Sequence, residues 1–119
     1  MRPAFFVDVV GILPVLIYRS AMTLEDVRRL VDLERSALEA SSVTALYVFG
    51  SIARGEADWG SDVDIIVDYD PRSAFDLVDL AGVQQRLAAR LNASVDVVTR
   101  KGLHRRIRDD VLRDAIRVM

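Results

Sequence analysis

The chain has 119 residues, which is enough for one domain, and its 51% hydrophobic and 29% charged residues are typical of a soluble globular protein. Cysteine is absent, which excludes disulfides and thiolate metal sites and suits a reducing cytoplasm, where we expect the protein to act. The net charge of −2 gives no general basic footprint, so we expect no direct nucleic-acid partner.

The N-terminal residues 4–18 form an apolar stretch that Asp8, Gly11 and Pro14 interrupt. The stretch is too short and too broken to span a membrane, and no clear small-residue cleavage pattern of a signal peptide follows it. Met22 is a candidate natural start, which would make residues 1–21 an upstream extension and residues 22–119 the domain. If the extension is ordered, it could add a strand or pack on a partner.

Helical and strand patterns alternate from Thr23 onward, where Thr23 and Asp26 have the spacing of a helix cap. The expected elements, in chain order, are a helix from Thr23 to about Ala40, a strand over Val43–Phe49, a short helix from Ser51 to about Glu56, a strand over Asp62–Asp68, a helix over about Ala74–Leu91 that Asn92 ends, a strand over Ser94–Thr99, and a last helix with an apolar stripe from Leu103 to Val118. This order predicts an α/β (α+β) fold, a small mixed β-sheet with helices packed on it.

Two short motifs stand at the ends of the first two predicted strands. Gly50-Ser51 ends the first strand, and Asp62 and Asp64 open the second, one residue apart and therefore on the same side of it. Two such carboxylates repel each other unless a cation lies between them, and Mg²⁺ prefers one or two carboxylates together with substrate phosphates. Gly50 allows the backbone to approach a phosphate, and a following helix would direct its free N–H groups at that anion. The motifs together indicate a site for a metal-bound nucleoside triphosphate.

A third acid, Asp96, stands between valines in the third predicted strand. A carboxylate in a core strand is costly unless it is paired or binds a metal. The alternative is that Asp96 faces solvent at the edge of the sheet.

The spacing Gly-Ser-x10-Asp-x-Asp resembles the signature of the DNA polymerase β-like nucleotidyltransferase superfamily, over about residues 23–117. The Ala-Arg-Gly that follows Ser51 looks most like the minimal nucleotidyltransferases, which are usually paired with HEPN-domain partners in toxin–antitoxin modules. The resemblance implies that Asp62 and Asp64 hold Mg²⁺ against ATP and that Asp96 joins a second Mg²⁺ on the acceptor side. Gly50 and Ser51 would bind the phosphates.

The resemblance also implies an activity and a partner: transfer of AMP from ATP to a tyrosine hydroxyl of a HEPN ribonuclease toxin, which makes the chain an antitoxin in a hetero-oligomer. Two alternatives stay open. The chain could neutralise the toxin by contact alone, or it could transfer a nucleotide to a small molecule. The excess of Lys and Arg in residues 100–119 is either a solvated helix face or a surface for an acidic partner or triphosphate.

Four further residues have weaker signals. Arg54 is a candidate phosphate ligand or a plain surface arginine, and Lys101 is a weak substitute for the arginine that the family frequently has where this chain has Ile52. His104 is the only histidine, and we expect a surface residue at a helix start. Trp59 could stack on a base or a partner, or form a hydrophobic lid.

Overall fold

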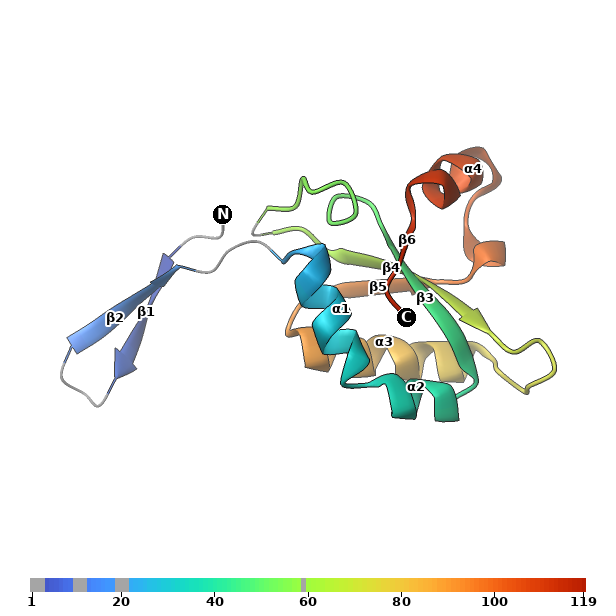
Figure 1. Cartoon of the computed structure of the whole chain (residues 1–119), viewed down its shortest axis with the longest axis horizontal. Helices are drawn as coiled ribbons and strands as arrows, with labels where there is room; N and C mark the ends of the chain where they lie inside the picture. Colours follow the sequence, from blue (N-terminus) through green and yellow to red (C-terminus); the bar gives the residue numbers. More distant parts are fainter. Residues whose placement is uncertain (1–3, 10–12, 19–21, 59) are drawn as a thin grey trace.

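A four-stranded mixed sheet organises the domain in the computed structural model, which describes residues 4–9, 13–18, 22–58 and 60–119. The strands of this sheet are β3 (Val43–Phe49), β4 (Val63–Tyr69), β5 (Val95–Val98) and β6 (Ile116–Arg117). The helices are α1 (Leu24–Asp32), α2 (Arg35–Ala40), α3 (Leu77–Leu91) and α4 (Arg105–Asp114), with a short 3₁₀ turn at Arg100–Gly102. Figure 1 shows α2 and α3 below this sheet and α4 above it. The predicted fold class is confirmed.

The strand order in the sheet is β5-β4-β3-β6. Strand β3 pairs antiparallel with β4 and with β6, whereas β4 pairs parallel with β5. A parallel pair needs a crossover connection, and α3 supplies it between β4 and β5. The edge strand β5 therefore lies beside β4 in the same direction, which decides where Asp96 lies.

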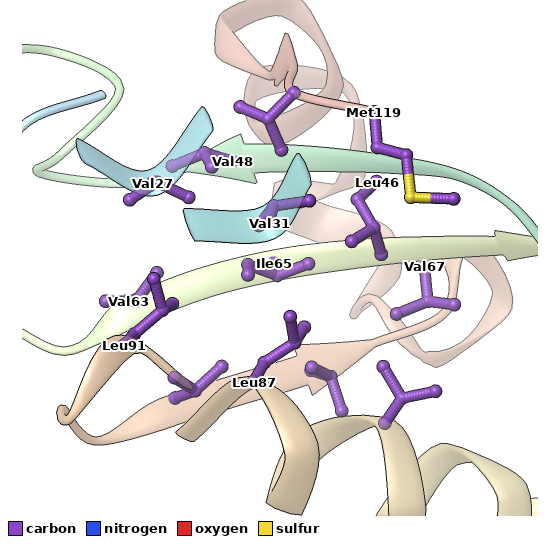
Figure 2. Close-up of a cluster of buried hydrophobic side chains, with 14 of the residues drawn as sticks. Val27, Val31, Leu46, Val48, Val63, Ile65, Val67, Leu87, Leu91 and Met119 are labelled. Atoms are coloured by element: carbon purple, nitrogen blue, oxygen red, sulfur yellow. The ribbon is translucent and has the colours of Figure 1, made fainter. Parts of the chain in front are cut away.

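The hydrophobic core lies between one face of this sheet and the helices α1–α3. Alternate residues of β4, namely Val63, Ile65 and Val67, are at most 1% exposed and point into the core, as the period of two predicts. Figure 2 shows these side chains among residues of α1, β3 and α3 and the C-terminal Met119. The labelled partners are Val27, Val31, Leu46, Val48, Leu87 and Leu91. The alternation leaves Asp64 on the other face.

The first predicted helix begins as expected but is divided in two. Thr23 and Asp26 form the capping box, with bonds of 3.1 Å from the Asp26 N–H to Thr23 Oγ1 and 3.0 Å from the Thr23 N–H to Asp26 Oδ2. The helix ends at Asp32 and a second one begins at Arg35. Glu34, in the break, accepts hydrogen bonds from Arg90 at 3.0 Å and Arg86 at 3.3 Å on α3. The single helix predicted through Ala40 is therefore wrong.

Helix α3 begins later than predicted, because Asp76 caps it with bonds from the N–H groups of Val78 at 3.0 Å and Asp79 at 3.1 Å. Its predicted end at Asn92 is confirmed, and Asn92 has the left-handed conformation of a helix C-terminus, with φ +49°.

The C-terminal segment also differs from the prediction. Helix α4 ends at Asp114, and Ile116 and Arg117 pair with Val48 and Tyr47 on the open edge of β3. Val118 then enters the core and not the helix stripe. Ile116 and Arg117 thereby pair with backbone groups at the edge of β3 that would otherwise lack a strand partner.

The N-terminal extension contributes two strands, β1 (Ala4–Val9) and β2 (Leu13–Tyr18), which pair antiparallel as a separate two-stranded sheet. In the described parts of the chain, no helix has the length and apolar character needed to cross a membrane.

Candidate functional site

The candidate site lies where β3 and β4 meet, on the face of the sheet away from the core. Phe49 and Asp64 are register partners there, so their side chains are on the same face. Gly50 follows with φ +76°, a left-handed conformation that favours glycine. A Cβ atom on Gly50 would lie 2.6 Å from Asp64 Oδ2. Only glycine therefore lets the turn after β3 approach the Asp64 carboxylate this closely.

The parallel register of β4 and β5 aligns Asp64 with Asp96. Asp64 is half-buried, whereas Asp96 is exposed on the edge strand. The expectation of a buried Asp96 in a core strand is wrong, because the valines on either side point to the core and leave the carboxylate on the open face. Asp96 is at the same time solvent-facing and next to Asp64.

Asp62 and Asp96 act electrostatically on Asp64. The pKa of Asp64 is raised above its usual range, first by burial and then by the negative charges of Asp96 and Asp62, while the positive charge of Arg54 lowers it. Asp62 is exposed in the loop directly before β4. The cluster therefore has an excess of negative charge that a cation would relieve.

Oxygen ligands of this kind fit Mg²⁺, provided that other ligands complete the shell. In the residues that the structure describes, no group of three or more acidic or histidine side chains could hold a metal ion by itself. Mg²⁺ usually takes one or two carboxylates together with water and substrate phosphates. The donor set thus suits a metal that arrives with a phosphate-bearing substrate.

Residues 51–56 form consecutive turns and not the short helix that the sequence predicts. The N–H of Arg54 donates to the Gly50 carbonyl at 3.2 Å, and the N–H of Glu56 donates to the Ser51 carbonyl at 2.8 Å. Gly55, with φ +71°, interrupts helical geometry at the end of this turn. Within the described parts of the chain, the N–H groups of residues 51–53 donate to no acceptor. An anion can accept hydrogen bonds from consecutive free amides of this kind without a helix.

The side chains of the turn point in different directions. Ile52 is 3% exposed and belongs to the core, so position 52 faces inward. Arg54 is exposed, and its Nε lies 3.1 Å from Glu56 Oε2. Because Arg54 also lowers the pKa of Asp64, its charge lies within electrostatic reach of the acids.

His104 and Lys101 fall outside this cluster. His104 caps α4, and its Nδ1 accepts a bond from the Arg106 N–H at 3.1 Å, which confirms a surface residue at a helix start. Lys101 is exposed and lines a different hollow, with Asp68 and Thr99. Trp59 lies outside the described residues.

Sequence reasoning missed a hollow next to the turn. It has a volume of about 330 Å³ and is lined by Phe49, Gly50, Arg54, Ile107, Asp110, Val111 and Asp114. The α4 residues gave no signal beyond an amphipathic stripe, because only the fold brings α4 to the end of β3. The sequence does give a signal for Phe49, because this residue directly precedes Gly50 at the end of a predicted strand.

Comparisons with known proteins agree with this geometry. A model of the nucleotidyltransferase domain family matches residues 30–118. The chain is 35% identical over 98 residues to the protein adenylyltransferase MntA of Thermococcus cleftensis, covering 82% of this chain and 97% of that protein. It also resembles the solved structure of a minimal nucleotidyltransferase, with 37% identity, a TM-score of 0.68, and coverage of 80% of this chain and 95% of the other.

A more distant structure contains an MNT antitoxin with a tri-AMPylated HEPN toxin from Shewanella oneidensis. It has 19% identity, a TM-score of 0.56, and coverage of 78% of this chain and 71% of the other, so this likeness concerns the fold alone. The family match and the two closer relatives extend over most of the domain. The chain therefore belongs to the nucleotidyltransferase domain family, as a nucleotidyltransferase of the minimal type.

Proposed function

We propose that this chain transfers AMP from Mg²⁺-bound ATP to a hydroxyl group of a HEPN-class toxin and thereby acts as its antitoxin. The observation that carries the proposal is the approach of Gly50 to the half-buried Asp64 carboxylate, with Asp62 and Asp96 close enough to raise its pKa. An anion-binding turn directly beside an acidic cluster suits a substrate that brings both a metal and phosphates.

Asp62 and Asp64 would hold the metal, and the free N–H groups after Gly50, with the Ser51 hydroxyl, would bind the outer phosphates. Mg²⁺, when bound, would neutralise charge on the phosphate oxygens. Arg54 would leave Glu56 to contact a phosphate. The loss of this ion pair costs little free energy, because the side chains of Arg54 and Glu56 are 47% and 64% exposed.

Asp96 would serve the acceptor side of the reaction. Its carboxylate would take the proton of the acceptor hydroxyl, whose oxygen forms a bond to the α-phosphorus. The bond from the α-phosphorus to the bridging oxygen breaks at the same time, and pyrophosphate leaves. An exposed Asp96 on an edge strand can be reached by a large acceptor such as a folded protein.

The choice of acceptor is supported by the relatives. The Thermococcus protein is named a protein adenylyltransferase, and the complex from Shewanella contains an AMPylated toxin. We propose a tyrosine as the acceptor residue, in line with the resemblance of the Gly-Ser and Asp-x-Asp motifs. The open face around Asp64 and Asp96 gives little of the enclosure that a small-molecule acceptor would need.

The test is a titration of toxin expression in cells against a fixed amount of this protein, as wild type and as the Asp62→Asn/Asp64→Asn double variant. A catalyst modifies many toxin molecules, whereas a blocker protects only as far as mass action allows. We expect wild type alone to protect when toxin is in excess, although both proteins still bind it. Equal protection at every ratio would favour neutralisation by contact alone.

A further inference from the structure

Residues 100–108, from the end of β5 into α4, contain five basic side chains and no acidic one. In the parts of the chain that the structure describes, every Lys and Arg side chain except three contacts a carboxylate or a backbone carbonyl. The three exceptions are Lys101, Arg105 and Arg106, and all three are exposed. The unpaired cations of the described structure are therefore gathered in one short segment.

The two arginines at the start of α4 also oppose the usual placement of charge in a helix. The first turns of α1 and α3 contain acidic side chains, which compensate the positive end of the helix dipole. The first turn of α4 contains no acidic residue but contains Arg105 and Arg106. In the next turn, Asp110 pairs with Arg113 instead. These two arginines do not stabilise the free helix, so their positive charge is available to an external anion.

The backbone at Lys101 is fixed by its neighbours on both sides. Arg100 donates to Asp68 of β4 from Nε at 2.8 Å and from Nη2 at 3.1 Å. Its guanidinium also lies 5.0 Å from the centre of the Tyr47 ring. Leu103, on the other side of Lys101, is 6% exposed. A cation on such a fixed segment binds a partner with a small loss of backbone freedom.

Lys101 also lines a hollow of about 360 Å³ at the C-terminal ends of β4 and β5, together with Thr44 and Asp68. Arg100 already neutralises Asp68, so the Lys101 ammonium is the uncompensated charge of this hollow. The exposed Thr44 has a hydroxyl group that can donate a hydrogen bond. A carboxylate side chain from outside would therefore find an unpaired ammonium and a hydroxyl donor there.

The hollow and the proposed reaction site lie at opposite ends of β4. Asp64, which is aligned with Asp96 of β5, lies four residues before Asp68. A strand advances about 3.3 Å per residue, so the two places are about 13 Å apart along the sheet. Side chains four residues apart in a strand point to the same face, which puts Asp64 and Asp68 on one side of the sheet. A protein that presents a hydroxyl to Asp96 can thus cover both places.

We propose that Lys101, Arg105 and Arg106 form a docking surface for an acidic segment of the acceptor protein. The inference rests on the proposed function, because it takes the acceptor to be a protein that is modified beside Asp96. One carboxylate of the segment enters the hollow and binds Lys101, and neighbouring carboxylates bind the two arginines. The carboxylate at Lys101 then lies about 13 Å from the acceptor hydroxyl, the length of about four residues of an extended segment.

The observations favour an acidic protein segment over RNA as the occupant of this surface. The chain has a net charge of −2, which disfavours a long polyanion. Binding of single-stranded RNA also uses aromatic rings that stack on bases. Tyr69 lines the hollow, but its ring is stacked on Phe75 with the ring centroids 4.6 Å apart. Tyr47 is half-buried beneath the guanidinium of Arg100.

The first experiment measures calorimetric binding of the full chain to its proposed HEPN-class partner, at low and at high salt. The test variant is Arg105→Gln/Arg106→Gln. Its matched control is Arg29→Gln/Arg113→Gln, which removes the same charge from side chains that are 71% and 72% exposed, each in an ion pair of 3.3 Å. We expect the test variant to bind about fivefold to tenfold more weakly, the effect of two lost surface ion pairs, and with a smaller salt dependence. The control should bind as wild type does.

AMP transfer by the same two variants separates docking from chemistry. The test variant should raise the KM for the partner and leave kcat unchanged, because docking contributes equally to the ground state and the transition state. ATP affinity should be the same in wild type, test variant and control, since neither pair of arginines belongs to the proposed nucleotide site.

The second experiment uses the fact that Lys101 is the only lysine of the chain. A carbodiimide couples an amine directly to a carboxylate that contacts it, and peptide mass spectrometry then identifies both residues. We expect Lys101 to be linked to an Asp or Glu of the partner. The matched control is Lys101→Arg, which keeps the charge and should keep the affinity but cannot form this link.

Unchanged affinity of the test variant, or a complex that forms without a link to Lys101, would overturn the docking surface and leave the proposed transfer intact. A test variant that loses affinity for a single-stranded RNA oligonucleotide, but not for the partner, would assign the surface to RNA and overturn the proposal as well. A wild-type protein that is linked through Lys101 but transfers no AMP would contradict the proposed function while supporting the surface. If wild type neither binds nor modifies the partner, both fail.

Discussion

The substitution Gly50→Ala separates the stability of the turn from the chemistry of the site. Gly50 has φ +76°, and a residue with a Cβ atom in this left-handed region costs about 1–2 kcal/mol. The new Cβ would also lie 2.6 Å from Asp64 Oδ2, well inside van der Waals contact. The carboxylate is the end of a rotatable side chain, so it moves away at little further cost in folding free energy.

Gly55→Ala is a matched control for the backbone effect. Gly55 has φ +71°, yet a Cβ there would meet no atom within 4 Å. Both variants should therefore lose about 1–2 kcal/mol in free energy of unfolding. In a domain of this size, each kcal/mol lost lowers the Tm by about 4–8 °C. Only Gly50→Ala displaces the Asp64 carboxylate, and a displacement of about 1 Å in a reacting site can cost on the order of 10²-fold in rate.

The assay combines thermal unfolding with the rate of Mg²⁺-dependent AMP transfer, measured well below both unfolding transitions. We expect similar Tm values for the two variants and a rate that is about 10²-fold lower for Gly50→Ala alone. Near-wild-type transfer by Gly50→Ala, or an equal loss of rate in both variants, would refute the role assigned to the contact between Gly50 and Asp64.

Four other changes have defined outcomes. Asp96→Asn should lower the turnover number by about 10²–10⁴-fold with little effect on ATP affinity; normal turnover with weak ATP binding would reverse its role. Glu34→Gln should lower the Tm at pH 7, because Arg90 first and then Arg86 hold the pKa of Glu34 below its usual 4.5. This stabilisation is present above pH 4.5 and is lost as the pH falls below it. The Tm values of wild type and Glu34→Gln, plotted against pH, should therefore converge in acid. Gly82→Ala should stabilise the domain by about 0.5–1 kcal/mol, since Gly82 lies within α3 and a Cβ there meets no atom within 4 Å; a lower Tm would contradict this. Removal of residues 1–21 should leave transfer unchanged, because the Thr23 cap begins the first helix by itself; loss of soluble expression would place the segment in the core or in an obligate interface.

The parts of the fold that the sequence predicts well are those set by local patterns. The predicted bounds of strand β3 agree with the structure, because a short run of apolar and β-branched residues stops at Gly50. The Thr23 cap and the Asn92 helix end have equally local causes. The faces of β4 follow from its alternation, so Asp64 could be separated from Val63 and Ile65 without a structure.

The parts that were missed depend on partners far away in the chain. The break between α1 and α2 coincides with Glu34, whose partners Arg86 and Arg90 are on α3. The two residues of β6 are too few to show a strand pattern and are recognisable only by their pairing with β3.

The site shows the same division. The sequence motifs identify Asp62, Asp64 and Asp96 as candidate site residues. The exposure of Asp96 could not be predicted, because it depends on the place of β5 at the edge of the sheet. The turn after Gly50 was predicted as a helix, because the sequence does not show that both Gly50 and Gly55 take left-handed conformations. The hollow beside α4 had no signature in the order of residues, since it joins positions more than fifty residues apart.

The most direct measurement is the transfer reaction itself. The purified protein is incubated with Mg²⁺, ATP labelled on the α-phosphate and its proposed HEPN-class partner, and the label is located by intact-mass and peptide mass spectrometry. We predict that AMP is attached to a tyrosine hydroxyl of the toxin, that chelation of Mg²⁺ prevents this, and that Asp62→Asn and Asp64→Asn each abolish it while the Tm shows a folded domain. Undiminished labelling by both variants, or a toxin that stays unlabelled although it binds the wild-type protein and ATP, would contradict the account.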